Sequence, residues 1–81
     1  MSPDRPPLTL DTLVAGERAT IESLDGEPAV MRRLMELGLI PGTPIAMIRR
    51  APLGDPLEVE VRGVHLSLRR AEAGRIGVTR G

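Results

Sequence analysis

Two glutamates and one histidine are the side chains of this sequence that could together hold a metal ion. Glu58, Glu60 and His65 lie on two short segments in which apolar and polar residues alternate, so all three share one face if the segments pair. Carboxylates and imidazole are suitable ligands for ferrous iron. An exposed trio with no buried supporting hydrogen bonds would bind weakly, however. A cross-strand pair between Glu60 and His65 is the simpler interpretation, and we prefer it to a metal site.

The pairing of these segments depends on a predicted hairpin. Leu57–Val61 and Val64–Leu68 alternate cleanly, and only Arg62 and Gly63 separate them. An X-Gly corner between two such segments is typical of a two-residue hairpin with a type I′ turn. The facing pairs are then Val61–Val64, Glu60–His65, Val59–Leu66, Glu58–Ser67 and Leu57–Leu68.

Arginine is the only basic residue type in the chain, and its 11 copies balance 11 acidic residues. Six of the arginines form adjacent pairs, which are Arg32-Arg33, Arg49-Arg50 and Arg69-Arg70. Such pairs could contact nucleic-acid phosphates, or one arginine could reach into the active site of a partner GTPase. The ordinary interpretation is that they are solvated surface charges. Zero net charge and the absence of aromatic residues further disfavour a nucleic-acid-binding barrel, which stays the alternative function.

The composition argues against catalysis. The chain has no cysteine, no lysine and one histidine, so it lacks the parts of nucleophilic triads, Schiff-base chemistry and thiolate metal sites. It also lacks the glycine-rich loop that cradles nucleotide phosphates. We therefore expect a non-enzymatic protein without a cofactor. No apolar stretch is long enough to span a bilayer and no signal peptide opens the chain, so a cytoplasmic protein is expected.

The order of predicted elements indicates a mainly β fold. An 81-residue chain is expected to form one domain, here over residues 8–81, preceded by a disordered proline-rich tail at residues 1–7. Residues 8–13 are expected to form a turn or a single helical turn, and residues 69–74 a short connection. The pattern predicts a small, closed or nearly closed β-barrel of about five strands, with one short helix after the first strand. The expected strands are Arg18–Leu24, Pro44–Arg50, Leu57–Val61, Val64–Leu68 and Arg75–Thr79.

The predicted helix begins at Pro28 and ends near Leu37, where it enters a tight corner. Gly38 is placed to take the left-handed conformation that ends a helix, with Leu39 folding back onto the last turn as in a Schellman motif. Pro41 and Gly42 then suit a type II turn. The helix residues expected to face the core are Val30, Leu34 and Leu37.

Five ordered blocks of this sequence resemble the FeoA family, and together they cover nearly the whole chain after Pro7. The blocks are Leu10–Gly16 with Ala19–Ile21, Arg33–Gly42, Ala51–Gly54, Val61–Gly63, and Leu68–Arg70 with Ala73, Ile76 and Val78. The resemblance implies an SH3-like barrel and an accessory role in ferrous-iron uptake. The implied partner is the cytoplasmic GTPase region of a FeoB-type permease. The fold also occurs in iron-dependent repressors, but no helix-turn-helix precedes it here, so we expect a free-standing accessory protein.

Exposed apolar residues near the helix and the proline-containing loops are the candidate partner-binding surface. Methionine adapts to varied apolar partners, although for either helix methionine we prefer the simpler interpretation that it fills a gap in a core without aromatic residues. A leucine at the tip of a loop of Pro, Gly and Asp has little local reason to be buried. The sequence leaves the oligomeric state open, with a weak homo-oligomer through the helix face or an open strand edge as one option. The candidate residues are Met31, Met35, Leu39, Ile40 and Leu53.

Overall fold

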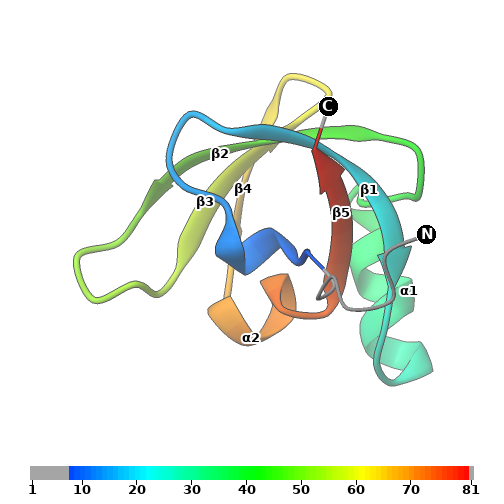
Figure 1. Ribbon diagram of the computed structural model, residues 1–81. Coiled ribbons are helices and arrows are strands. Elements are labelled where there is room, and N and C mark those ends of the chain that lie inside the picture. The colour runs from blue at the N-terminus through cyan, green and yellow to red at the C-terminus, as the bar shows by residue number, and fades with distance from the viewer. Residues whose placement is uncertain (1–7, 81) are drawn as a thin grey trace.

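The computed structural model describes residues 8–80 and contains five strands, one nine-residue helix and two short helical turns (Figure 1). The predicted mainly β fold with a helix between the first two strands is confirmed. The expected tail at residues 1–7 lies outside the described residues. In chain order the elements are η1 (Leu10–Thr12), β1 (Arg18–Leu24), α1 (Pro28–Glu36), β2 (Pro44–Arg50), β3 (Leu57–Val61), β4 (Val64–Leu68), α2 (Arg70–Ala73) and β5 (Ile76–Arg80).

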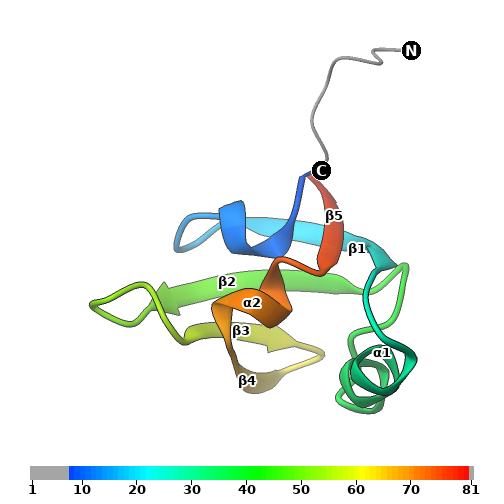
Figure 2. The same cartoon turned by 90° about the horizontal axis from the view of Figure 1, so that it is seen from below.

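The strands form one antiparallel sheet in the order β4-β3-β2-β1-β5. The register shifts between Ile21 and Ser23 in β1 and between Met47 and Arg49 in β2. Such bulges increase local twist and let a sheet curve around a core. Within residues 8–80, β4 and β5 end the sheet without pairing with each other, so the barrel is open rather than closed (Figure 2).

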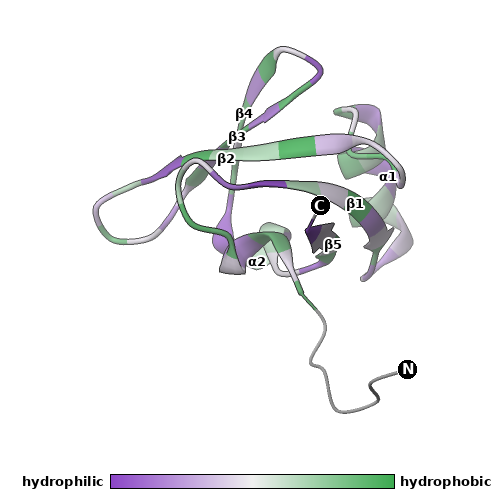
Figure 3. Cartoon of the chain, turned by 45° about the horizontal axis from the view of Figure 1, so that its top comes forward, coloured by the Kyte–Doolittle hydropathy of each residue, from purple (hydrophilic) through white to green (hydrophobic). Residues whose placement is uncertain are grey.

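The core is aliphatic and draws on every strand, on α1 and on both short helical turns. Strand β3 shows the alternation most clearly, because Leu57, Val59 and Val61 are buried while the two glutamates between them are half-buried. Apolar residues are accordingly distributed over the strands and α1 (Figure 3). The fully buried large side chains are Leu10, Leu13, Ile21, Leu34, Leu39, Ile45, Met47, Leu57, Val59, Leu68 and Ile76.

The end of α1 has the predicted Schellman geometry. Gly38 has a φ of 100°, its N–H donates to the Met35 carbonyl at 3.0 Å, and the Leu39 N–H donates to the Leu34 carbonyl at 3.1 Å. Leu39 is thereby turned into the core, where it is 0% exposed. The type II turn is confirmed too, since Gly42 has a φ of 93° and the chain reverses there into β2. These bonds fix the angle at which α1 meets the sheet.

Replacing Gly38 with alanine is expected to lower the free energy of unfolding by about 1–2 kcal/mol, because a Cβ disfavours the left-handed conformation. Gly74→Ala is the control, since Gly74 has ordinary helical angles (φ −68°) and an added Cβ would make only normal contacts, at 3.6 Å. We expect Gly74→Ala to be neutral or slightly stabilising. Urea unfolding followed by circular dichroism measures both variants, and equal losses would refute the geometric explanation.

The β3–β4 hairpin has the predicted turn and register. Arg62 and Gly63 have φ values of 52° and 79°, as a type I′ turn requires at both central positions. The five facing pairs run without interruption from Val61–Val64 to Leu57–Leu68. The hairpin thus places the two glutamates and the histidine on one face, as the sequence predicted.

Candidate protein-docking surfaces

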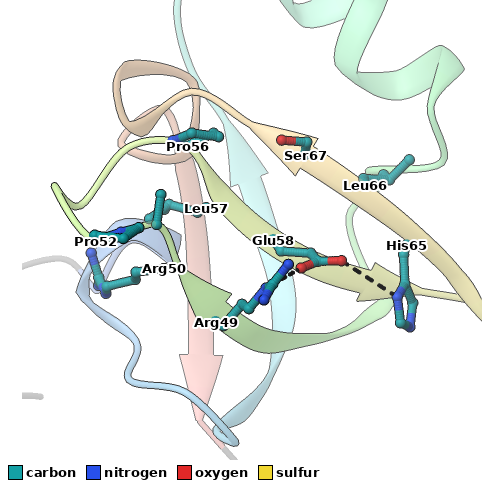
Figure 4. A pocket seen from close by; sticks show the side chains of 10 residues that line it. Arg49, Arg50, Pro52, Pro56, Leu57, Glu58, His65, Leu66 and Ser67 are labelled. Atoms are coloured by element: carbon teal, nitrogen blue, oxygen red, sulfur yellow. Dashed lines mark hydrogen bonds and ion pairs between the residues drawn. The ribbon is translucent and has the colours of Figure 1, made fainter.

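Two of the three weak candidates for metal ligands, Glu58 and His65, form an ion-pair cluster with Arg49. Glu60 lies opposite His65 in the register, but the histidine pairs with Glu58 instead, with Nδ1 and Oε2 3.7 Å apart. The other oxygen of Glu58 accepts a hydrogen bond from Arg49 Nε at 2.7 Å (Figure 4). The preferred Glu60–His65 side-chain pair is therefore corrected to a diagonal pair with Glu58, because that carboxylate is drawn between the histidine and the arginine.

The surroundings of Glu58 do not favour a metal ion. Across residues 8–80, no group of three His, Cys, Asp or Glu side chains comes close enough together to hold one. A guanidinium in direct contact with the central carboxylate would also repel a second cation. Glu58, Glu60 and His65 therefore share a face without forming the ligand set that they suggested.

A cavity of about 450 Å³ lies beside this cluster, between the β2–β3 loop and β4 (Figure 4). Arg50 lines it, but its guanidinium is engaged elsewhere: Nη2 donates to the Leu13 carbonyl at 2.8 Å and also to the Asp11 carbonyl. Arg50 thus ties β2 to the η1 segment. This role leaves little of the guanidinium for a bound ligand.

Two more arginines of these adjacent pairs have ion-pair partners within the chain. Arg33 pairs with Glu72 of α2, and Arg49 with Glu58, as described above. The backbone N–H of Arg70 donates to Asp55 Oδ1 at 3.0 Å. The side-chain contacts of Arg33, Arg49 and Arg50 favour a structural role over phosphate contacts for these three arginines.

An apolar surface lies on the outer side of α1. A cavity of about 520 Å³ lies on this side of the helix. It is lined by Pro28, Met31, Arg32, Met35 and Glu36, and we call these five residues the α1 face. The Met35 side chain is 42% exposed, and Met31 is half-buried. Ile40, just beyond the helix, is 38% exposed. The α1 face therefore combines adaptable methionines with a charged residue of each sign.

Two of the predicted surface residues do not belong with the α1 face. Leu39 is 0% exposed and packs in the core, because the Schellman motif folds it inward. Leu53 is 94% exposed, as its loop context suggested, but the β2–β3 loop projects from the end of the molecule opposite α1 (Figures 1 and 2). The single predicted surface is thus two separate ones.

The loop that carries Leu53 is tied at its base. The Ala51 N–H donates to the Pro56 carbonyl at 3.0 Å, the Gly54 N–H donates to the Ala51 carbonyl at 2.7 Å, and Asp55 accepts the bond from α2. Leu53 therefore projects from a hydrogen-bonded loop. Because these bonds already hold the loop backbone in place, little backbone entropy is lost when a partner binds Leu53.

Sequence reasoning missed three exposed apolar residues. Leu37, predicted to face the core, is 43% exposed because α1 ends at Glu36 and Leu39 takes the inward position instead. Val14 and Val64 are 60% and 54% exposed. The position of Val64 beside the hairpin turn was a usable signal, because strand ends next to a turn often extend past the core.

Comparison with known proteins places these features in context. The protein-family model described as the FeoA domain matches residues 8–80 of this chain. The solution structure of the FeoA protein from Chlorobium tepidum is 49% identical, with a TM-score of 0.85, over 90% of this chain and 70% of that one. The Stenotrophomonas maltophilia FeoA structure, complexed with zinc and described as a prokaryotic SH3 domain protein, is 36% identical, with a TM-score of 0.77 and 88% of each chain covered. The expected SH3-like fold is thereby confirmed.

One relative joins two proteins in a single chain. It is the Fe(2+) transport protein A/Fe(2+) transporter FeoB fusion protein of Porphyromonas gingivalis, 32% identical over 71 residues. The match covers 88% of this chain and 8% of the fusion protein. Among residues 8–80 of the present chain, no helix is long and apolar enough to cross a membrane.

Proposed function

This chain belongs to the FeoA domain family, and from this membership we propose that it is a non-enzymatic, cytoplasmic accessory protein of ferrous-iron uptake that binds the cytoplasmic region of a FeoB-type permease. The observation that carries the proposal is the fusion protein, in which a relative of this chain is covalently joined to the transporter. Two proteins that are fused in one organism often associate as separate chains in another. The proposal includes no resident metal and no nucleotide site.

The α1 face is the surface that best suits such a partner. Its two methionines can adapt to an apolar partner surface, and Arg32 and Glu36 beside them can orient it. Ile40 lies just beyond the end of α1. Leu53, at the opposite end, offers a second and independent contact. We expect the two methionines to anchor the contact, since a few central residues usually dominate the binding energy of an interface.

Met35→Asp is expected to weaken binding to the purified cytoplasmic region of the permease by at least about tenfold, because it places a charge in the apolar centre of the contact. Calorimetric titration measures the affinity, and Leu53→Asp tests the second surface in the same way. Val14→Asp is the matched control, since it adds the same charge at an exposed valine outside both surfaces.

Circular dichroism must show that each variant keeps its fold. If folded Met35→Asp and Leu53→Asp both bind like wild type, the proposed surfaces are wrong although the partner is right. If the wild-type protein does not bind the permease region at all, the proposed function itself fails.

A further inference from the structure

The two edges of the sheet differ in how they are covered. On the outer side of β5, Thr9 forms a bridge with Gly77, and the Val78 N–H donates to the Leu8 carbonyl at 2.9 Å. The segment before η1 thus covers this edge. On the opposite side, β4 is the last strand of the sheet within residues 8–80, and it lies at the lower margin of the sheet in Figure 2. One edge is protected and the other is open.

The open edge presents the backbone groups of two residues. In a two-residue hairpin, the two residues that flank the turn exchange backbone hydrogen bonds with each other. Along the strands, such hydrogen-bonded residue pairs alternate with pairs that are not hydrogen-bonded to each other. Val64, Leu66 and Leu68 therefore bond to β3, while the N–H and C=O groups of His65 and Ser67 point away from it. Within residues 8–80, neither of these two residues makes a backbone hydrogen bond outside the strand ladder. Two donors and two acceptors are left on this edge.

Strand β4 lacks the features that usually prevent edge pairing. Proteins block open edges with charged residues, prolines, bulges or a covering segment. The sequence of β4, Val-His-Leu-Ser-Leu, contains no proline and no residue of fixed charge. Its pairing with β3 is continuous, whereas β1 and β2 both contain register shifts. Strand β4 is therefore free of register shifts and carries no fixed charge.

We propose that β4 pairs antiparallel with β4 of a second copy of this chain, centred on Leu66. In this register His65 of one copy faces Ser67 of the other, so all the free donors and acceptors of both edges are matched. The two Leu66 side chains meet on one face, and the exposed Val64 takes the position opposite Leu68, which stays buried in the core of its own copy. No like charges oppose one another within the strand. The edge is self-complementary, which favours a second copy over an unrelated segment.

The ends of the paired strands define how the dimer responds to salt. The register brings the exposed Arg62 of one copy toward the exposed Arg69 and Arg70 of the other. Repulsion between arginines is screened as ionic strength rises. The contact is also short, since each strand has five residues. The dimer is therefore weak and becomes stronger when salt is added. This inference does not depend on the permease as partner.

The test measures mass against concentration by sedimentation equilibrium for wild type and Ser67→Pro. Proline removes the Ser67 N–H, which points outward, so the fold is expected to survive while the association constant falls at least about tenfold. Ser67→Ala keeps the N–H and should dimerise like wild type. Dimerisation of folded Ser67→Pro with wild-type affinity overturns the proposal. The proposal is also overturned if Met35→Lys abolishes the dimer while Ser67→Pro leaves it intact, because that result assigns the contact to the α1 face.

A cross-linking experiment decides the outcome if Ser67→Pro does not fold. The natural sequence has no cysteine, so Leu66→Cys introduces a single thiol at the proposed centre of the dimer. Facing residues of a pair without hydrogen bonds have Cα atoms about 4.5 Å apart, within reach of a disulfide. The control His65→Cys places the two thiols diagonally, out of reach. Faster oxidation to a disulfide dimer of Leu66→Cys than of His65→Cys supports the proposal, and equal rates refute it.

Discussion

Leu34→Ala is expected to lower the free energy of unfolding by about 2–5 kcal/mol and to leave much of the protein unfolded. Leu34 is 0% exposed and is the single buried residue of α1. The attachment of the helix to the sheet therefore depends mainly on this side chain, together with the partly buried Val30 and with Leu39 just beyond the helix. A domain of this size buries little surface and has no aromatic residue to compensate.

Met35→Ala is the matched control for Leu34→Ala. Met35 follows Leu34 in the same helix and has a side chain of similar volume, and both variants place an alanine in the helix. Met35 differs in being 42% exposed. We expect it to cost less than about 1 kcal/mol. Urea unfolding monitored by circular dichroism gives both values. Similar losses for the two variants would mean that α1 is attached through its outer methionines and would overturn the assignment of the α1 face as a free surface.

The second large effect is expected at Arg50. Arg50→Met keeps an apolar stem in the same place but removes the guanidinium that donates to the carbonyls of Asp11 and Leu13. Hydrogen bonds from a charged donor contribute about 1.5–3 kcal/mol each, so a loss of about 2–3 kcal/mol is expected for this half-buried site. Leu13 is itself fully buried, and loosening the η1 segment would expose it.

Arg49→Met is the control for Arg50→Met, because the two arginines are adjacent on β2. The Arg49 side chain is 76% exposed and pairs with Glu58 at the surface, so its removal should cost less than about 1 kcal/mol. Native-state hydrogen exchange adds a local measurement, since Arg50→Met should increase amide exchange in residues 10–13 and Arg49→Met should not. The explanation fails if the two variants unfold at the same urea concentration and exchange alike.

Local patterns predicted most of the secondary structure. The hairpin followed from an X-Gly corner, the end of α1 from Gly38, and the reversal into β2 from Pro41 and Gly42. Each of these depends on backbone conformations that only a few residue types adopt readily. Strand β5 begins one residue later than predicted and α1 ends one residue earlier, at Glu36. Such ends depend on hydrogen-bond partners elsewhere in the chain.

The candidate docking surfaces were harder to predict from the sequence. An apolar pattern does not reveal which of two nearby leucines is buried, and here Leu39 is buried while Leu37 is 43% exposed. Nor does it reveal that the structure separates Leu53 from the α1 face, since both lie near proline-containing corners of the chain. The arginine pairs show the same limit, because Arg50 and Arg33 find their partners 37 to 39 residues away.

The amino-acid sequence alone therefore determined the elements, the hairpin register and the absence of thiol, lysine and aromatic chemistry, because these depend on residue types and on neighbours a few positions apart. Tertiary structure alone decided that Glu58 rather than Glu60 pairs with His65 and that the apolar candidates form two surfaces. It also decided that, within residues 8–80, β4 rather than β5 is the open edge. The physical reason is that side-chain partners and edge coverage are set by contacts between distant segments, which exist only when the whole sheet has formed.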